Sequence, residues 1–258
     1  MADRLAELRR WYPAPNGHPV DDETFEPNAP VDMRYLIFRQ RTSDGAGAFA
    51  VDALFPAVLA GNADTSGVDE GTADLLYGLV RGLQPKVVLE TGTHKGRSTR
   101  ALVTALRKNA ETVVTPRAFT TTFAPGHLWT IDAEDHEIYR SGAIPAVCHS
   151  YVTPLIGWTP EAFTQEPLAS LQGIDFAFLD GDHSAEGLEA ELTYVDGHRA
   201  AECWVAIDNS RDAAWPGIAR TLQQWTKYPR LSLATCTGLD LIWMSNSARS
   251  PRAETAGG

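Results

Sequence analysis

The feature that most constrains the fold is a regular alternation of short apolar segments with segments of helical periodicity, which begins near residue 68. Strands that alternate with helices favour a parallel sheet covered by helices on both faces. The last two apolar segments, joined through Thr237 and Gly238, instead predict an antiparallel pair. The seven expected strands occupy residues 86–90, 127–132, 149–155, 174–180, 203–209, 230–236 and 238–245.

These elements predict one α/β domain over residues 68–245: a Rossmann-like, doubly wound, mostly parallel seven-stranded sheet with an antiparallel C-terminal edge strand. Residues 1–67 differ, because they are rich in Pro, Asp, Asn and Gly around two apolar runs. They are interpreted as an N-terminal arm that packs on the domain, or as a lid or dimerisation element; both interpretations stay open. The polar tail, residues 246–258, is expected to be disordered.

The composition argues against several partners. The chain carries 33 acidic and 22 basic residues, a net charge of −11, and no Lys/Arg block, so we discount nucleic acid as a partner. No apolar run approaches the roughly 18 residues that span a bilayer, so no membrane partner is expected. Cys148, Cys203 and Cys236 are isolated from one another, as is typical of reduced thiols in a cytoplasmic protein.

A glycine-containing loop, "ETGTHKG" from Glu90 to Gly96, joins the first expected strand to a helix. Glycines at such a turn let a ligand approach the backbone, and the N-terminus of the helix favours an anionic group. The pattern ExGxxxG departs from the dinucleotide fingerprint GxGxxG, and the phosphate-binding pattern GxxxxGK[ST] is absent. Glu90 would repel a pyrophosphate and suits a cationic ligand. A tight turn with glycines needed only for packing is the alternative.

Three further acidic motifs stand at strand ends. Asp132 ends the second strand, where a carboxylate can take both hydroxyls of a ribose, although alone it would be interpreted as a helix cap. Asp180 ends the fourth strand, and Asp208 and Asn209 end the fifth. The carboxyl ends of neighbouring parallel strands meet in one crevice, so these three residues are expected to offer oxygen ligands to Mg²⁺, with Mn²⁺ or Ca²⁺ as alternatives. Taken singly, each is better explained by a cap or a turn, and only their joint position favours a metal site.

The ordered set "VLETGTHKGRS", "WTID", "FLDGDH" and "AIDN…PGI" resembles the class I S-adenosylmethionine-dependent methyltransferases over residues 68–245. More narrowly, it is similar to the metal-dependent small-molecule O-methyltransferases, both the catechol and caffeoyl-coenzyme A type and the bacterial sugar and antibiotic-tailoring type. The resemblance implies that Gly92, Thr93 and Gly96 hold the methionine part of the cofactor, with Ser98 at its carboxylate and Glu90 near its cationic end. It also implies that Asp132 holds the ribose, that Trp158 or Thr159 flanks the adenine, and that Asp180 lies beside both the cofactor and the metal.

Two residues after the fourth strand are candidate bases. A divalent cation lowers the pKa of a bound hydroxyl, and a nearby base then takes the proton. The position of His183 resembles the site of the catalytic lysine in catechol-type enzymes. The position of Asp182 resembles that of an acid used by related sugar methyltransferases. We favour His183, whose ordinary pKa suits a base near neutrality, with Asp182 as the group that orients it or supports the metal. A solvent-facing histidine at a helix start is the alternative.

The expected activity is therefore transfer of a methyl group from S-adenosylmethionine to a hydroxyl of a small molecule, such as a sugar, a phenol or another secondary metabolite. Two alternatives stay open at this point. One is a nicotinamide-dependent oxidoreductase, against which the missing GxGxxG argues, and the other is a non-catalytic cofactor-binding member of the same fold. Substrate specificity is expected in residues 1–67, 108–126 and 210–217.

Overall fold

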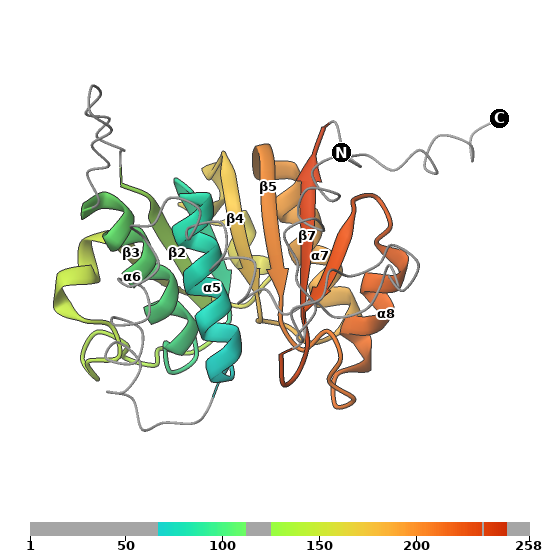
Figure 1. The fold of residues 1–258 in the computed structure, drawn as a ribbon, viewed down its shortest axis with the longest axis horizontal. Helices are drawn as coiled ribbons and strands as arrows, with labels where there is room; N and C mark the ends of the chain where they lie inside the picture. Colours follow the sequence, from blue (N-terminus) through green and yellow to red (C-terminus); the bar gives the residue numbers. More distant parts are fainter. Residues whose placement is uncertain (1–66, 112–124, 234, 247–258) are drawn as a thin grey trace, which may run out of the picture.

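A computed structural model describes residues 67–111, 125–233 and 235–246. Its centre is one sheet in the order β3-β2-β1-β4-β5-β7-β6 (Figure 1), in which β1 to β5 run parallel and β7 runs antiparallel to both β5 and β6. The strands are β1 (Val87–Thr91), β2 (His127–Asp132), β3 (Val152–Ile156), β4 (Ile174–Leu179), β5 (Arg199–Ile207), β6 (Arg230–Leu233) and β7 (Leu239–Ser245).

The sheet confirms the predicted fold class and refines its edge. The C-terminal strand β7 is antiparallel as expected, but it lies between β5 and β6, so β6 forms the edge. The predicted strand at 149–155 begins at Val152, because the preceding residues form the short 3-10 helix η2 (Ala146–Tyr151). Apart from Gly67 and Asn246, the predicted arm and tail lie outside the described residues, as does most of the insertion 108–126.

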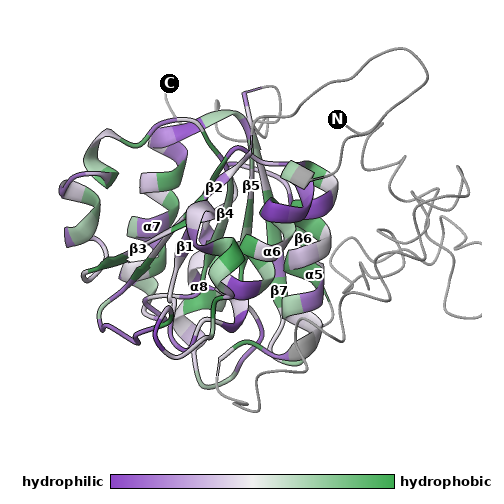
Figure 2. Ribbon diagram, turned by 90° about the vertical axis from the view of Figure 1, so that its left-hand side faces the viewer, coloured by the Kyte–Doolittle hydropathy of each residue, from purple (hydrophilic) through white to green (hydrophobic). Residues whose placement is uncertain are grey.

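Helices cover both faces of the sheet. Helices α5 (Glu70–Leu83) and α6 (Arg97–Glu111) pack on one face, and α7 (Ala185–His198) and α8 (Pro216–Gln224) pack on the other (Figure 1). Strand β4 shows why two layers form: Phe176 and Phe178 belong to one core, whereas Ala177 and Leu179, which alternate with them, belong to the other. In Figure 2 the strands carry mainly hydrophobic residues, and the covering helices carry both kinds.

Side-chain caps fix where two of the helices start. Asp69 begins α5 by accepting hydrogen bonds from the backbone N–H and the hydroxyl of Thr72 at 3.0 and 2.9 Å. Ser184 caps α7 by accepting a bond from the backbone N–H of Gly187. Two short 3-10 helices, η3 (Glu161–Thr164) and η4 (Leu168–Ser170), connect β3 to β4. Among the described residues, no helix is long and apolar enough to cross a membrane.

Candidate active site

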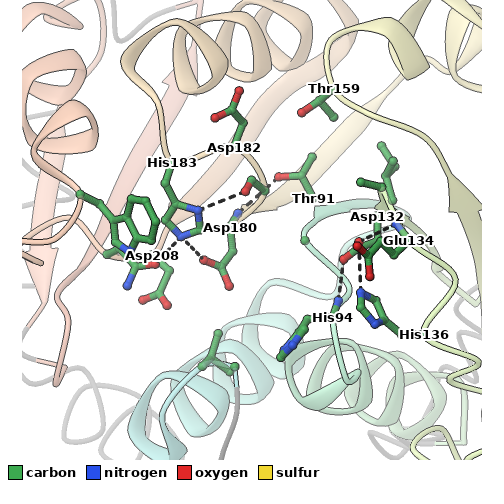
Figure 3. A pocket seen from close by; sticks show the side chains of 18 of the residues that line it. Thr91, His94, Asp132, Glu134, His136, Thr159, Asp180, Asp182, His183 and Asp208 are labelled. Atoms are coloured by element: carbon green, nitrogen blue, oxygen red, sulfur yellow. Dashed lines mark hydrogen bonds and ion pairs between the residues drawn. The ribbon is translucent and has the colours of Figure 1, made fainter.

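A cavity of about 810 Å³ opens at the carboxyl ends of the parallel strands. Its walls come from the loops after β1, β2, β3, β4 and β5 and from the start of α5 and the β6–β7 loop. This is the crevice that an open α/β sheet offers to ligands. Of the predicted site residues, the cavity is lined by Gly92, Asp132, Trp158, Asp180, Asp182, His183, Asp208 and Asn209 (Figure 3).

The β1–α6 loop crosses the end of β4 at very close range. Gly92 has φ +81°, and a Cβ added to it would lie 2.1 Å from the carbonyl oxygen of Asp180. Gly96 has φ +80°, and its added Cβ would meet the side chains of Ile138 and Ala143 at 3.3 and 3.4 Å. Both glycines are therefore required by backbone geometry and packing, the explanation that the sequence left as the alternative; Gly92 also lines the cavity.

Gly92→Ala is expected to lower the free energy of unfolding by roughly 3 kcal/mol or more, because left-handed strain and the clash with Asp180 add together. Gly142→Ala is the matched control, since its φ is +73° and no described atom lies within 4 Å of its added Cβ. That variant should lose only about 1–2 kcal/mol from strain. Denaturant unfolding measures both values, and equal losses would show that the approach to Asp180 does not require glycine.

A small recess lies where α6 begins. It is lined by Gly92, Thr93 and Ser98, together with Lys95 and Arg97. Ser98 is buried in the first turn of α6, and the hydroxyl of Thr93 lies 2.6 Å from that of Thr130. The recess thus combines the positive end of a helix and two basic residues with one acid, Asp180, and the free N–H groups of the helix are the part suited to an anionic group.

Glu90 lies beneath the loop. In the described part of the chain it lines neither the large cavity nor the small recess. It is fully buried, and its Oε2 accepts hydrogen bonds from the hydroxyls of Thr99 and Thr130 at 2.7 and 2.6 Å. Burial raises the pKa of this carboxyl group to about 7. Its side chain ties β1, β2 and α6 together below the cavity floor.

Asp132 connects the β2 end to the glycine loop. Its Oδ2 accepts the backbone N–H of His94 at 2.7 Å, and its Oδ1 faces the backbone N–H of Glu134 at 3.0 Å and the Nε2 of His136 at 3.2 Å. Asp132 does not cap a helix, because the residues after it form turns. Trp158, with 70% of its surface exposed, lines the same cavity from the loop after β3.

The three predicted metal ligands lie on one wall of the cavity. The Nε2 of His183 lies 2.9 Å from Asn209 Oδ1 and 3.4 Å from Asp180 Oδ1, and Asp208 Oδ1 accepts a 3.3 Å bond from the hydroxyl of Thr237. In Figure 3 the carboxylates of Asp180 and Asp208 lie on the same side of the His183 ring. Burial, and next the charge of Asp180, raise the pKa of Asp208 to about 7. Within the described ranges, no three His, Cys, Asp or Glu side chains alone form a metal cluster.

The two candidate bases face different partners. The Nδ1 of His183 lies 3.1 Å from the carbonyl oxygen of Gly181, and its ring packs against Trp215 with centroids 4.6 Å apart. The hydrogen bond with Asp180 raises the pKa of His183 to about 9, so the ring carries a proton at neutral pH. Asp182 accepts the backbone N–H of Ser184 at 2.9 Å and points away from that ring (Figure 3). Gly181 and Asn209, rather than Asp182, orient the histidine.

Several site residues were not singled out from the sequence. Asp69 lines the cavity in addition to capping α5, and Cys236 and Thr237 reach it from the β6–β7 loop. No local pattern distinguishes these positions. Glu191 is a buried acid on α7 whose carboxylate contacts the cavity loops. A signal for it existed, because the helical spacing of α7 places it on the same face as Leu188 and Leu192.

Residues 89–210 match the model of a family described as "Methyltransferase domain". No curated protein matches the chain. Among solved structures, the O-methyltransferase TomG from Streptomyces achromogenes, involved in tomaymycin synthesis and solved with S-adenosylmethionine, is 19% identical with a TM-score of 0.54, over 76% of this chain and 90% of that one.

Two further structures share the fold. An O-methyltransferase from Bacillus cereus, solved with S-adenosylhomocysteine, is 19% identical with a TM-score of 0.55, over 80% of this chain and 96% of that one. A methyltransferase from Geobacter sulfurreducens is 19% identical with a TM-score of 0.51, over 84% and 98%. Residues 89–210 are thus similar to a methyltransferase domain, and the chain shares the α/β fold of these methyltransferase structures.

Proposed function

We propose that the protein transfers the methyl group of S-adenosylmethionine to a hydroxyl of a small molecule, with a divalent cation held by Asp180, Asp208 and Asn209. The observation that carries this proposal is the meeting of these three oxygen-bearing side chains on a wall of the cavity that Gly92 and Asp132 also line. The cavity thus offers a cofactor side and a cation side within one volume.

The residues of the cofactor side fit S-adenosylmethionine. The recess at the start of α6, where Lys95 and Arg97 lie beside the N-terminus of the helix, suits the methionine carboxylate. Asp132 has carboxylate lone pairs for the ribose hydroxyls, and the exposed indole of Trp158 offers a flat apolar face to adenine. When bound, the cofactor supplies an electrophilic sulfonium methyl group. Glu90 supports the loop from below instead of contacting the ligand.

The residues of the cation side fit a hard divalent ion. Two carboxylates and an amide oxygen are the donors preferred by Mg²⁺, with Mn²⁺ or Ca²⁺ as alternatives. When bound, such an ion supplies Lewis acidity to the acceptor hydroxyl. Both nitrogens of His183 face acceptor oxygens, so its ring already donates from both and holds Asp180 and Asn209 in place. Asp182, which lines the cavity and makes no contact with that ring, is therefore the better proton acceptor of the two candidates.

The proposed acceptors are hydroxylated small molecules of secondary metabolism, such as sugars or phenols. The likeness to TomG supports this class, because that enzyme takes part in tomaymycin synthesis. The net charge of −11 supports a small-molecule acceptor over a nucleic acid. The three isolated cysteines agree with a cytoplasmic protein.

Calorimetric titration with S-adenosylhomocysteine and with NAD tests the cofactor side, and methyl transfer to a panel of sugars and phenols tests the reaction. We expect binding of S-adenosylhomocysteine alone. Removal of metal with EDTA should lower the transfer rate at least about 10-fold, and added Mg²⁺ should restore it, because the acceptor hydroxyl loses its Lewis acid. Binding of NAD alone would overturn the cofactor assignment, and an unchanged rate in EDTA would overturn the metal dependence.

A further inference from the structure

Glu191 is a buried carboxylate on α7 that does not itself line the cavity, as far as the described residues form it. Only 1% of its surface is exposed. A carboxylate at such a position costs free energy unless hydrogen bonds compensate for the lost water, and a hydrophobic residue of similar size would avoid that cost. The partners of Glu191 therefore indicate what the carboxylate does.

Three hydrogen-bond donors from three different segments converge on this carboxylate. The hydroxyl of Thr159, in the loop after β3, donates to Oε1 at 2.9 Å. The hydroxyl of Thr91, at the end of β1, and the backbone N–H of Asp182, in the β4–α7 loop, also face the carboxylate and favour its charged form. All three donor residues line the cavity. Burial raises the pKa of Glu191 to about 7, and the three donors lower it in part.

Thr91 extends this connection to Asp180. The backbone N–H of Asp180 donates to the carbonyl oxygen of Thr91 at 3.1 Å and lies 3.3 Å from its hydroxyl oxygen. A threonine hydroxyl can accept one hydrogen bond while it donates another, so the chain of contacts runs from the Asp180 backbone through Thr91 to Glu191. The first predicted metal ligand is thus connected to the buried acid.

The carboxylate also packs directly against the turn that follows Asp180. A Cβ added to Gly181 would lie 2.7 Å from Glu191 Oε1 and 3.0 Å from the Cβ of Thr91. The turn therefore passes the acid at a distance that leaves no room for a side chain. Any movement of the Glu191 carboxylate must be accommodated by the backbone on which Asp180 and Asp182 stand.

We propose that Glu191 is a positioning residue, which holds the Trp158–Thr159 loop on the cofactor side and the Asp180–Asp182 turn on the cation side in one arrangement. The inference rests on the proposed function, because it assigns those two loops to cofactor and cation. Glu191 acts through the hydroxyls of Thr159 and Thr91 and the backbone of the turn, and it has no contact of its own with the reacting groups.

Three variants test this assignment: Glu191→Gln, Thr159→Val and the control Glu189→Gln, which makes the same change on the exposed face of α7. The probes are S-adenosylhomocysteine, measured by calorimetry, and Mn²⁺, measured by electron paramagnetic resonance. A carboxamide offers one acceptor oxygen where the carboxylate offers two. Glu191→Gln should therefore weaken both ligands by about fivefold or more, the equivalent of about one hydrogen bond.

Thr159→Val keeps its shape and loses only the donor to Glu191, so it should weaken S-adenosylhomocysteine to a similar degree and leave Mn²⁺ unchanged. Glu189→Gln should change neither. Thermal melting of each variant separates positioning from simple stability: a Glu191→Gln protein that melts earlier yet binds both probes within twofold of the wild type overturns the proposal. If Glu191→Gln does not fold, Thr159→Val tests the proposal instead. Binding of S-adenosylhomocysteine within twofold of the wild type would then overturn it.

Failure of the proposed function gives a different result. If the wild-type protein binds S-adenosylhomocysteine but not Mn²⁺, the metal dependence is wrong, and Glu191 is judged on S-adenosylhomocysteine binding alone. If wild-type binding of both probes is intact and the Glu191→Gln protein binds as the wild type does, Glu191 has no positioning role while the proposed function stands.

Discussion

Replacing Asp208 with asparagine is expected to lower kcat/KM for methyl transfer by at least about 100-fold, because the substitution removes a charged ligand from the proposed cation site. Changes to groups that only support metal ligands already cost about 10–100-fold, so loss of a direct ligand should cost no less. Mn²⁺ affinity should fall in parallel. Measuring the affinity by electron paramagnetic resonance makes the result independent of the acceptor.

The same variant should be more stable than the wild type when no metal is present. Asp208 is buried beside Asp180, and both burial and the charge of Asp180 raise its pKa. An asparagine of the same shape removes this unfavourable charge, so the metal-free melting temperature should rise. Asp135→Asn is the control, because it changes the net charge equally at an exposed turn outside the cavity. An Asp208→Asn enzyme that retains transfer within threefold of the wild type would contradict the metal site.

The metal-free protein is expected to lose stability as the pH rises from 5 to 9, and the fall should be on the order of 10 °C in Tm. The pKa values of Glu90, Glu191 and Asp208 are raised by burial to about 7, and the hydrogen bond with Asp180 raises that of His183 to about 9. All four groups therefore bind protons more tightly in the folded protein than in the unfolded chain.

The sign follows from that difference. A carboxyl group with a raised pKa in the folded state favours folding while it is protonated, and this contribution is lost between its ordinary pKa, near 4, and about 7. His183 favours folding below its ordinary pKa of 6.5, and its contribution is lost as the pH rises to about 9. The pKa of Asp196 is lowered by its hydrogen bonds with Lys227 and other partners, but it acts in the acidic range below this window.

Thermal melting in metal-free buffer across this pH range measures the effect. Glu90→Gln removes one of the titrating groups, so its melting temperature should change less between pH 5 and pH 7 than that of the wild type. Glu161→Gln, an exposed acid on η3, should leave the curve unchanged. A melting temperature that rises steadily from pH 5 to pH 8 would show that these buried groups do not govern the stability of the fold.

Much of the site's location follows from the sequence. The apolar segments in the sequence predict where β1, β2, β4 and β5 end. Parallel strands must bring their carboxyl ends to one edge of the sheet. Asp132, Asp180 and Asp208 therefore had to meet at a common cavity, as they do. The antiparallel pair at the C-terminus was also predictable, because a connection this short can join only antiparallel strands.

The edge of the sheet and the contacts within the site depended on the tertiary structure. Local periodicity gives the strands but not the insertion of β7 between β5 and β6. It also does not reveal that His183 turns toward Asn209, 26 residues away, instead of Asp182, its neighbour. The orientation of a side chain is decided by whichever acceptors the other loops place around it, and those positions are known only once the sheet is assembled.

The same distinction applies to the glycine loop and to Glu191. The sequence by itself determined that a turn with Gly92 and Gly96 follows β1 and that a helix follows β4. Only the tertiary structure decided that Gly92 lies against the Asp180 backbone and that Glu191 meets Thr159 from 32 residues away. Strand ends and helix faces follow from backbone periodicity, whereas contacts between loops follow from packing among segments that are distant in the chain.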